Sequence, residues 1–452
     1  MKNIISFILL LSFFVACSSN GKKQNLNFTS EQINEVIKTM TDVMVHDVTN
    51  PPLAGRFFSY SMLAGYEVIA QNDGRYNSMA GVLNDYPTLT KPDSLAGYST
   101  QLSTLLAMME TAKKMQPSGA YVDSFEVRFL DSCRREGLSE EVIINSVKYS
   151  RAISKAILLY ARADRYNRIS NYPRYTPENT PGSWYPTPPG FFAPVEPYFN
   201  TVRPLTLDTC IQFRPDPPVP FSSDKRSQFY KLLKQNYDEG SRLSDEHREI
   251  AAFWDCNPFA LQDNGHLMSG RKKMSPGAHW LLITGIACRQ AKTDFAESMK
   301  IHTVVSIGLM DGFICCWDEK FRSNRIRPET AIRQNIDAGY KPLLQTPPFP
   351  EYLSGHSTIS AASAVILSHY FGDRFSYNDR SEEAYGLPSR KFSSFQNAAI
   401  EAGISRFYGG IHFMDAINNG RKQGLKVGDW VLHKVENKAL AFSDPGSSHF
   451  TK

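Results

Sequence analysis

The sequence has little excess charge and no cysteine pattern typical of a zinc site or a disulfide framework. Its 452 residues carry a formal net charge of +5, which is small for this length and excludes nucleic-acid binding driven by overall charge. The sequence has no CxxC pair and no histidine–cysteine cluster at zinc spacing. We interpret the six cysteines after Cys17 as buried small hydrophobic residues: Cys133, Cys210, Cys256, Cys288, Cys315 and Cys316.

The sequence also lacks convincing alternating strand patterns and internal repeats. Apolar residues instead recur at helical spacing, first in 33–40, and we expect Pro51-Pro52 to end that helix. Further helices are predicted at 57–69, 102–115, 142–163, 248–253, 279–291, 295–317, 358–367 and 396–404. With 42% hydrophobic and 12% aromatic residues, the chain is predicted to be an all-α globular protein built from one or more helical bundles.

A short apolar run, 4–16, lies at the N-terminus and ends at Cys17. It is too short to cross a bilayer as a helix, and Phe14-Val15-Ala16-Cys17 resembles a bacterial lipobox, whose cysteine is lipidated after cleavage. We expect 1–17 to be a lipoprotein signal peptide and 18–26 a polar tether. The protein would then be exported, periplasmic or anchored to the outer membrane by its lipid alone; cleavage nearby as an ordinary signal peptide is the alternative.

Proline is concentrated in one segment, 171–220, which holds 13 of the 27 prolines and many aromatic residues. A linker between domains is one interpretation, but linkers are rarely this aromatic. We favour a rigid arm wrapped over a helical body, which could also form a wall at the mouth of an active site. The remaining chain, 27–452, is then predicted to be a single all-α domain.

The stretch Ser354-Gly355-His356 directly precedes the predicted helix 358–367. At a helix N-terminus, free main-chain N–H groups and the positive end of the dipole attract an anion. Glycine allows close approach of the backbone, and the serine hydroxyl adds a donor. An ordinary capping turn is the alternative for this short motif.

Three cations and a second histidine flank this stretch in the sequence. Lys320 and Arg327 are seven residues apart, so on a continuing helix they share one face until Pro328 breaks it. Arg406 follows another helical run and precedes His412. Together these residues could hold an oxyanion, because several cations in one cleft are costly to desolvate without a negative partner. A solvated basic helix end is the alternative for Lys320 and Arg327.

In order, Lys320 to Pro328 reads Lys-x6-Arg-Pro, Ser354 to His356 reads Ser-Gly-His, and Ser405 to His412 reads Ser-Arg-x5-His. This triple pattern resembles the signature of the type 2 phosphatidic acid phosphatase and vanadium haloperoxidase superfamily. The resemblance covers the last third of the chain, with a catalytic part at about 300–435. Leu353 departs from the usual proline, and Asp415 follows His412 by three residues rather than four.

The resemblance implies different chemistry in its two branches. In a haloperoxidase, His412 is the vanadate ligand, the cations with Ser354 and Gly355 hold the vanadate oxygens, and His356 is the acid–base group. The substrates are then hydrogen peroxide and a halide, iodide or bromide, and phosphate may occupy the same site. In a phosphatase, His412 is instead the nucleophile, forming a phosphohistidine, and His356 is the general acid.

Several residues favour the haloperoxidase branch. Trp317, three residues before Lys320, and Phe349, seven before His356, resemble that branch, as do the proline-rich arm and the stretch Phe253-Trp254-Asp255. The displaced Asp415 weakens the phosphatase interpretation, which needs an aspartate to orient the nucleophile. A non-catalytic oxyanion-binding lipoprotein remains a third hypothesis, although a binder would not need His356.

Other residues have less certain roles. Asp255 could pair with Arg406, or be an acid at the surface. Ser363 could face the halide, or be a small core serine. Trp317 and Phe349 could be core aromatics, or walls that exclude water from the pocket. We interpret His266, His279 and His302 as structural, because they lack partners at ligand spacing in the sequence.

Overall fold

The computed structural model describes residues 26–91, 95–263, 268–270 and 272–437. Cys17, the proposed signal peptide 1–17 and His266 lie outside these residues. The described chain is helical almost throughout, with two short antiparallel hairpins, which confirms the predicted all-α class. The hairpins pair β1 (Leu261–Asp263) with β2 (Met268–Gly270), and β3 (Tyr377–Asp379) with β4 (Arg390–Phe392).

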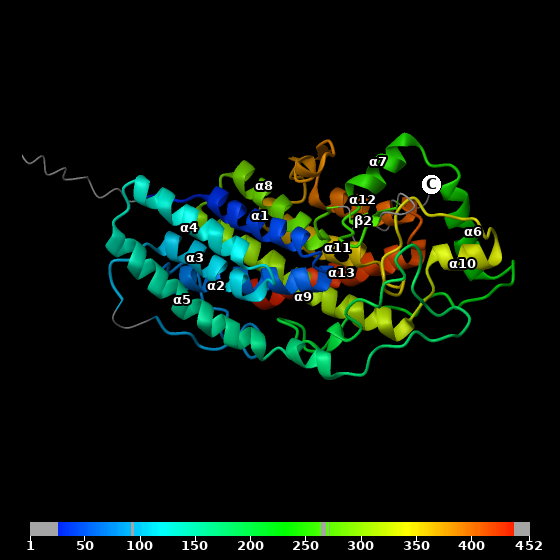
Figure 1. The fold of residues 1–452 in the computed structure, drawn as a ribbon, viewed down its shortest axis with the longest axis horizontal. Coiled ribbons are helices and arrows are strands. Elements are labelled where there is room, and N and C mark those ends of the chain that lie inside the picture. The colour runs from blue at the N-terminus through cyan, green and yellow to red at the C-terminus, as the bar shows by residue number, and fades with distance from the viewer. Residues whose placement is uncertain (1–25, 92–94, 264–267, 271, 438–452) are drawn as a thin grey trace, which may run out of the picture.

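Helices of the N-terminal part gather towards one end of the molecule (Figure 1, blue to cyan). They are α1 (Ser30–His46), α2 (Pro51–Ala70), α3 (Thr100–Met115), α4 (Ala120–Arg135) and α5 (Glu140–Arg162). The prediction that Pro51-Pro52 ends the first helix was wrong. α1 ends at His46, and both prolines lie at the start of α2, where the missing N–H groups need no helical partner.

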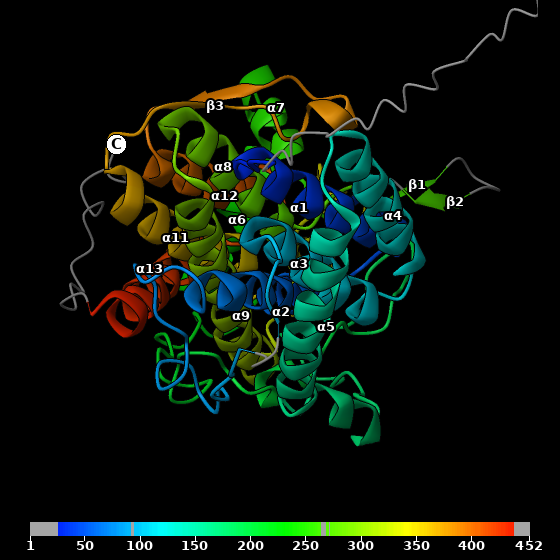
Figure 2. The ribbon, with the colours of Figure 1, turned by 90° about the vertical axis from the view of Figure 1, so that its left-hand side faces the viewer.

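In the second half of the chain, the described residues form eight helices and a short 3-10 turn, η3 (Glu383–Tyr385). The helices are α6 (Gln228–Gly240), α7 (Asp245–Phe253), α8 (Pro276–Ala291), α9 (Phe295–Ser323), α10 (Pro328–Asn335), α11 (Gly355–Phe371), α12 (Phe395–Tyr408) and α13 (Met414–Glu436). Seen from the α5 side, α9 runs through the middle of the bundle, with α11 and α13 on one side and α3 to α5 on the other (Figure 2).

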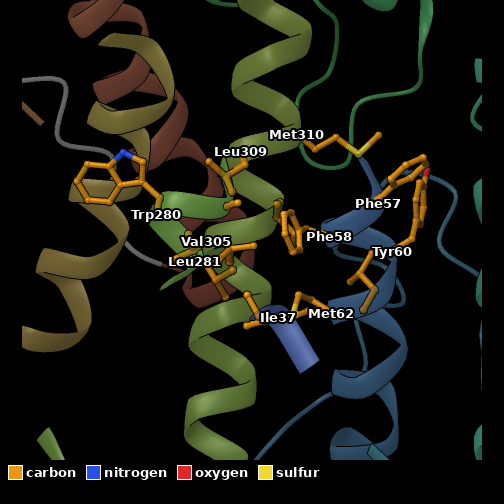
Figure 3. Close-up of a cluster of buried hydrophobic side chains, with 14 of the residues drawn as sticks. Ile37, Phe57, Phe58, Tyr60, Met62, Trp280, Leu281, Val305, Leu309 and Met310 are labelled. Carbon is orange, nitrogen blue, oxygen red and sulfur yellow. The ribbon is translucent and has the colours of Figure 1, made fainter. Parts of the chain in front are cut away.

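The long helix α9 is the centre of the core. It is buried on nearly every face, as expected for a helix surrounded by others. Figure 3 shows Phe58 of α2 and Leu281 of α8 directed towards α9. By length and composition α9 could also span a membrane, but its most apolar window is 94% buried inside the molecule. Among the described residues it is therefore a core helix.

The helix expected to carry both Lys320 and Arg327 ends between them, which corrects the sequence-based prediction. α9 ends at Ser323, and Asn324 adopts a left-handed conformation with φ of 47°. Arg327 then caps α10, with Pro328 at its first position. The two cations therefore reach the same region from separate helices, connected by a turn.

The proline-rich arm wraps over the helical body, as predicted. Apart from the end of η1 (Tyr166–Asn171) and the short turn η2 (Phe199–Thr201), residues 171–220 form no helix. Asp311 on α9 anchors the arm: its buried carboxylate accepts main-chain N–H groups of Leu205, at 2.6 Å, and Thr206, at 2.8 Å. The Thr206 hydroxyl also donates to it, at 2.6 Å.

Candidate active site

A cavity lies beside the first turn of α11, where distant parts of the chain meet. Its walls include Trp317, Phe349, His356, Arg406 and His412. The aromatic pair comes from α9 and from the segment before α11, and the two histidines come from α11 and from the turn after α12. The structure thus brings the three sequence motifs to one place.

Ser354 caps α11 as the sequence predicted. Its hydroxyl oxygen accepts the main-chain N–H of Ser357 at 3.3 Å and the Ser357 hydroxyl at 2.9 Å. These bonds use the oxygen of Ser354 as an acceptor, so its own hydroxyl proton can still be donated. Gly355 begins the helix and borders the cavity. A Cβ at Gly355 would lie 3.5 Å from the Trp317 ring.

Arg327 is completely buried and only partly satisfied. Its Nε donates to the main-chain oxygen of Phe349 at 2.8 Å, and its Nη1 to that of Ile411 at 2.9 Å. Nη2 is buried without a hydrogen-bond partner in the described chain. Burial lowers the pKa of this guanidinium to about 9, against the attraction of Glu351, and repulsion from Arg406 adds to the effect. One donor is therefore free for an anion.

Arg406, near the end of α12, is similarly incomplete. Its Nη1 donates to the main-chain oxygen of Trp254 at 2.8 Å, while Nε is buried with no partner among the residues described. Burial lowers the pKa of Arg406, opposed by the charge of Asp255. The ion-pair partner of Asp255, however, is Lys273, at 2.8 Å. Asp255 therefore attracts Arg406 electrostatically, but the two side chains do not form the predicted ion pair.

The His356 imidazole borders the cavity with one unpaired nitrogen. Its Nε2 is buried and has no hydrogen-bond partner within the described residues. The ring does bond to the main chain of Trp254, which must involve Nδ1 as donor because Nε2 is unpaired. Burial and repulsion from Arg406 and His412 hold the pKa of His356 well below its usual range. The neutral imidazole therefore presents a lone pair on Nε2.

His412 is held by a carboxylate that the sequence analysis did not assign to it. Its Nδ1 lies 3.0 Å from Oε1 of Glu351, and the same oxygen accepts the main-chain N–H of Phe413 at 2.8 Å. Nε2 lies on the other side of the ring, 3.2 Å from Nη1 of Arg327. Burial and repulsion from Arg327 and Lys320 keep the pKa of His412 well below its usual range. With its proton on Nδ1, the ring can offer Nε2 to a ligand.

Glu351 is in turn fixed by Arg325. Nε of Arg325 donates to Oε2 of Glu351 at 2.6 Å, and its two terminal nitrogens donate to Asp415 at 2.6 and 2.8 Å. Burial disfavours the charge of Arg325, but both carboxylates outweigh burial and raise its pKa. Asp415 therefore orients Arg325, whereas the sequence analysis considered it only in relation to His412.

Lys320 is fully buried, and main-chain oxygens take all its donors. Nζ donates to Pro350 at 3.0 Å, to Glu351 at 3.2 Å, and also to Leu353. Burial lowers the pKa of Lys320 to about 7, and repulsion from Arg327 contributes. The ammonium group of Lys320 therefore has hydrogen-bond partners, unlike the unpaired cation that the sequence suggested. Its lowered pKa means that it loses its proton more easily than an exposed lysine does.

Trp317 and Phe349 form an aromatic wall of the cavity. Their rings lie 5.1 Å apart, and Nζ of Lys320 lies 5.0 Å from the centre of the Phe349 ring. The indole N–H of Trp317 donates to the main-chain oxygen of Val195 at 3.1 Å. The arm thus reaches the site by holding Trp317, and the residues that border the cavity are not arm residues.

Ser363 is not among the residues that border the cavity, and its role at the halide position stays a prediction. It is fully buried on α11, two turns beyond His356, as a small core residue. His302 is also buried, with Nδ1 2.7 Å from the main-chain oxygen of Ser298, which agrees with a structural role. His279 is buried between Cys256 and Asp379, and its structural role stays a prediction.

The unpaired donors around the cavity fit an oxyanion. The free groups are Nη2 of Arg327 and Nε of Arg406, beside the start of α11. Burial depresses the pKa of each cation in the set, which is the cost of gathering positive charge without a negative partner. A tetrahedral oxyanion would supply both the acceptors and the missing charge.

Comparison with known proteins identifies the family of this chain. A family model for the VCPO second helical-bundle domain matches residues 300–439. The structure is similar to that of a bacterial vanadium-dependent iodoperoxidase, with a TM-score of 0.86 and 42% sequence identity over 91% of this chain and 98% of that chain. This chain belongs to the vanadium haloperoxidase family. As a haloperoxidase it is an oxidoreductase, which confirms the predicted enzyme class.

More distant structures share the fold of this haloperoxidase. A bacterial vanadium-dependent chloroperoxidase resembles it with a TM-score of 0.63 in both its holo and apo forms, at 15% and 16% identity. The match covers 86% of this chain in both cases, and 93% and 95% of those chains. No relative among curated proteins matches significantly.

Proposed function

We propose that this haloperoxidase uses vanadate to oxidise iodide or bromide with hydrogen peroxide, giving hypohalous acid. The observation that carries the proposal is His412, a buried imidazole with Nδ1 on Glu351 and Nε2 beside the guanidinium of Arg327, which has an unpaired donor of its own. The likeness to an iodoperoxidase supports iodide as the preferred halide. When bound, vanadate supplies a Lewis-acid centre that activates peroxide without itself changing oxidation state.

His412 would be the protein ligand of vanadate, through Nε2. Arg327, Arg406, Ser354 and the main-chain N–H of Gly355 would hold its oxygens, and Lys320 would contribute charge. Except for Lys320, whose donors are all taken by main-chain oxygens, each group either has an unused donor or lies at the positive end of α11. These residues match the anion in charge and in hydrogen-bonding capacity.

His356 would move protons during peroxide activation. Its lone pair on Nε2 borders the cavity, and its neutral state allows it to accept a proton from hydrogen peroxide and later return it. The carbonyl of Trp254 keeps the imidazole in this tautomer by accepting from Nδ1. His356 is therefore assigned the acid–base role, and His412 the role of ligand.

The aromatic wall would keep water away from the reacting oxygen and leave an apolar approach for the halide. Trp317 and Phe349 are both buried, and the arm fixes Trp317 in place. A dry pocket also strengthens the attraction between the cations and a bound oxyanion. A polarisable halide loses less hydration energy than a smaller one on entering such a pocket.

The alternative from the sequence is phosphohistidine chemistry, and one argument against it no longer holds. The displaced Asp415 was counted against it, yet Glu351 gives His412 the carboxylate partner that a nucleophile would need. The pocket geometry alone therefore fits both branches, and membership of the haloperoxidase family favours halide oxidation.

Export as a lipoprotein remains our proposal for localisation, based on Phe14-Val15-Ala16-Cys17. Wild-type protein should partition into the detergent phase of a membrane extract, and Cys17→Ala protein should stay in the aqueous phase. Wild-type protein found only in the aqueous phase would exclude the lipid anchor.

Equilibrium dialysis of vanadate-free protein tests the function. The protein should bind about one vanadate per chain, because it has one candidate ligand, His412. Peroxide-dependent iodide oxidation should rise in proportion to the bound vanadate, and phosphate should compete for the pocket. Activity that is independent of vanadate, or unaffected by any phosphate concentration, would contradict the shared-pocket model.

A further inference from the structure

Cys256, His279 and Glu382 lie far apart in the sequence but place three ligand-type atoms around one point. Sγ of Cys256 lies 3.6 Å from Nδ1 of His279, and this nitrogen lies 3.6 Å from Oε1 of Glu382. Sγ and Oε1 are 3.9 Å apart. All three side chains are buried. The result is a closed triangle of a thiol, an imidazole and a carboxylate.

Without a metal, only two long hydrogen bonds of the Cys256 thiol and one long ion pair hold this triangle together. The distance of 3.6 Å between His279 and Glu382 exceeds the range of about 2.7–3.2 Å typical of N–H···O bonds. The two sulfur contacts are long and weak as well. In contrast, ligands at about 2.0–2.3 Å from a tetrahedral metal lie about 3.3–3.8 Å from one another. The two edges of 3.6 Å fall within that range, and the edge of 3.9 Å lies just above it.

Asp379 supplies an independent observation that points to a ligand. Its Oδ2 lies 2.8 Å from Nε2 of His279, and its Oδ1 accepts the main-chain N–H and the hydroxyl of Ser381 at 3.0 and 2.6 Å. A carboxylate on one nitrogen of a histidine ring is the usual support of a metal-bound imidazole. When a metal is bound, Asp379 would keep the proton on Nε2, so that the lone pair on Nδ1 faces Cys256 and Glu382.

We propose that Cys256, His279 and Glu382 bind a zinc ion. A thiolate with an imidazole suits this borderline-soft cation, whereas calcium and magnesium prefer all-oxygen sites. The thiolate of Cys256 and the carboxylate of Glu382 balance the two charges of the ion. Three protein ligands leave one position of a tetrahedron for water.

The zinc would hold the main chain that positions two groups of the oxyanion pocket. Cys256 follows Trp254 by two residues, and the carbonyl of Trp254 accepts hydrogen bonds from Arg406 and His356. The Trp254 ring also stacks on His279, with centres 4.6 Å apart. The ion would tie the segment after α7 to α8 and to the loop between β3 and η3. It is a positioning site with its own set of ligands, although Cys256 also borders the cavity proposed for vanadate.

Metal analysis of purified protein tests the proposal independently of vanadate. Protein carrying a tag without histidine, produced with zinc in the medium and dialysed, should retain about one zinc ion per chain, as expected for one site with three protein ligands. Cys256→Ser and Glu382→Gln should each weaken zinc binding at least about tenfold. Cys133→Ser, which removes a buried thiol from α4, should retain wild-type zinc content.

Cobalt provides a readout on the wild-type chain that does not depend on the folding of a variant. Chelator-treated wild-type protein reloaded with cobalt(II) should show a thiolate-to-metal charge-transfer band and the visible bands of a tetrahedral site. Wild-type protein that retains no zinc and develops no such bands would overturn the site. Zinc that remains bound in both Cys256→Ser and Glu382→Gln would also overturn it. Failure of vanadate-dependent activity would leave the zinc result unaffected.

Discussion

Oε1 of Glu351 lies 3.0 Å from Nδ1 of His412, with the imidazole between this carboxylate and the guanidinium of Arg327. The carboxylate selects the tautomer of the histidine, and Arg325 fixes the carboxylate. Glu351 and Arg325 therefore orient His412, and its other ring nitrogen, Nε2, lies 3.2 Å from Nη1 of Arg327. Loss of the Glu351 charge should therefore change mainly the orientation and basicity of the His412 nitrogen that would bind vanadate.

Glu351→Gln should weaken vanadate binding by about 10- to 100-fold, the usual loss when a partner of a metal-bound histidine is altered. Turnover at saturating vanadate should fall much less, because His356 and the arginines are unchanged. Vanadate titrations of iodide oxidation separate the two effects. Asp415→Asn is the matched control, since it removes the other partner of Arg325 and leaves the Glu351–His412 contact. Equal losses in both variants would contradict a specific role for Glu351.

The two histidines should give different defects if their roles are assigned correctly. His412→Ala should weaken vanadate binding by more than about 100-fold, because it removes the ligand itself rather than its partner. His356→Ala should bind vanadate nearly normally but turn over about 10²- to 10⁴-fold more slowly, the range expected for loss of an acid–base group. Equilibrium dialysis and initial rates on the same preparations make the comparison. Similar vanadate affinities in both variants would rule out this division of roles.

Vanadate affinity should depend on pH through Lys320. Its pKa of about 7 in the ligand-free pocket lies below its ordinary value, so above that pH the free protein must take up a proton when an anion binds. Affinity should therefore fall as pH rises from 7 to 9, by up to about tenfold per unit. Lys320→Met should flatten this dependence. The ratio of wild-type to variant affinity at each pH cancels the ionisation of vanadate itself, and a constant ratio would contradict the prediction.

Asp311→Ala should destabilise the fold by about 2–5 kcal/mol, because buried main-chain donors of the arm lose their acceptor. Urea or thermal unfolding measures the loss. Asp208→Ala, at an exposed position in the same arm, should have little effect. The Asp311 variant should also show altered Trp317 fluorescence, because the arm holds the indole through Val195. A stability equal to that of the control would show that Asp311 does not anchor the arm.

Sequence patterns located most of the helices and the three motifs of the pocket, because both depend on residues close together in the chain. The helix carrying Lys320 was extended too far, since apolar periodicity does not reveal the left-handed turn at Asn324. Pro51 was predicted to end the first helix, but proline is also common at the first position of a helix, and the sequence pattern does not distinguish the two cases. In both cases the helix itself was predicted correctly, and the position of its end was not.

Partners across long sequence separations could not be predicted in the same way. Glu351 and His412 are 61 residues apart, and only the packing of the pre-α11 segment against the turn after α12 brings them together. Glu351 nevertheless carries a signal: it is a lone carboxylate in the apolar stretch 348–353. The triangle of Cys256, His279 and Glu382 carries no such signal, because its spacings match no compact metal motif.

Wild-type protein assayed for both reactions of the superfamily tests the central claim most directly. A single vanadate-free preparation would be assayed for peroxide-dependent iodide oxidation and for phosphoester hydrolysis. Vanadate would be titrated in both assays. We predict iodide oxidation that appears with vanadate and saturates, little ester hydrolysis, and no phosphohistidine after rapid quenching. Brisk ester hydrolysis with a phosphohistidine intermediate, and no vanadate-dependent halide oxidation, would contradict the account.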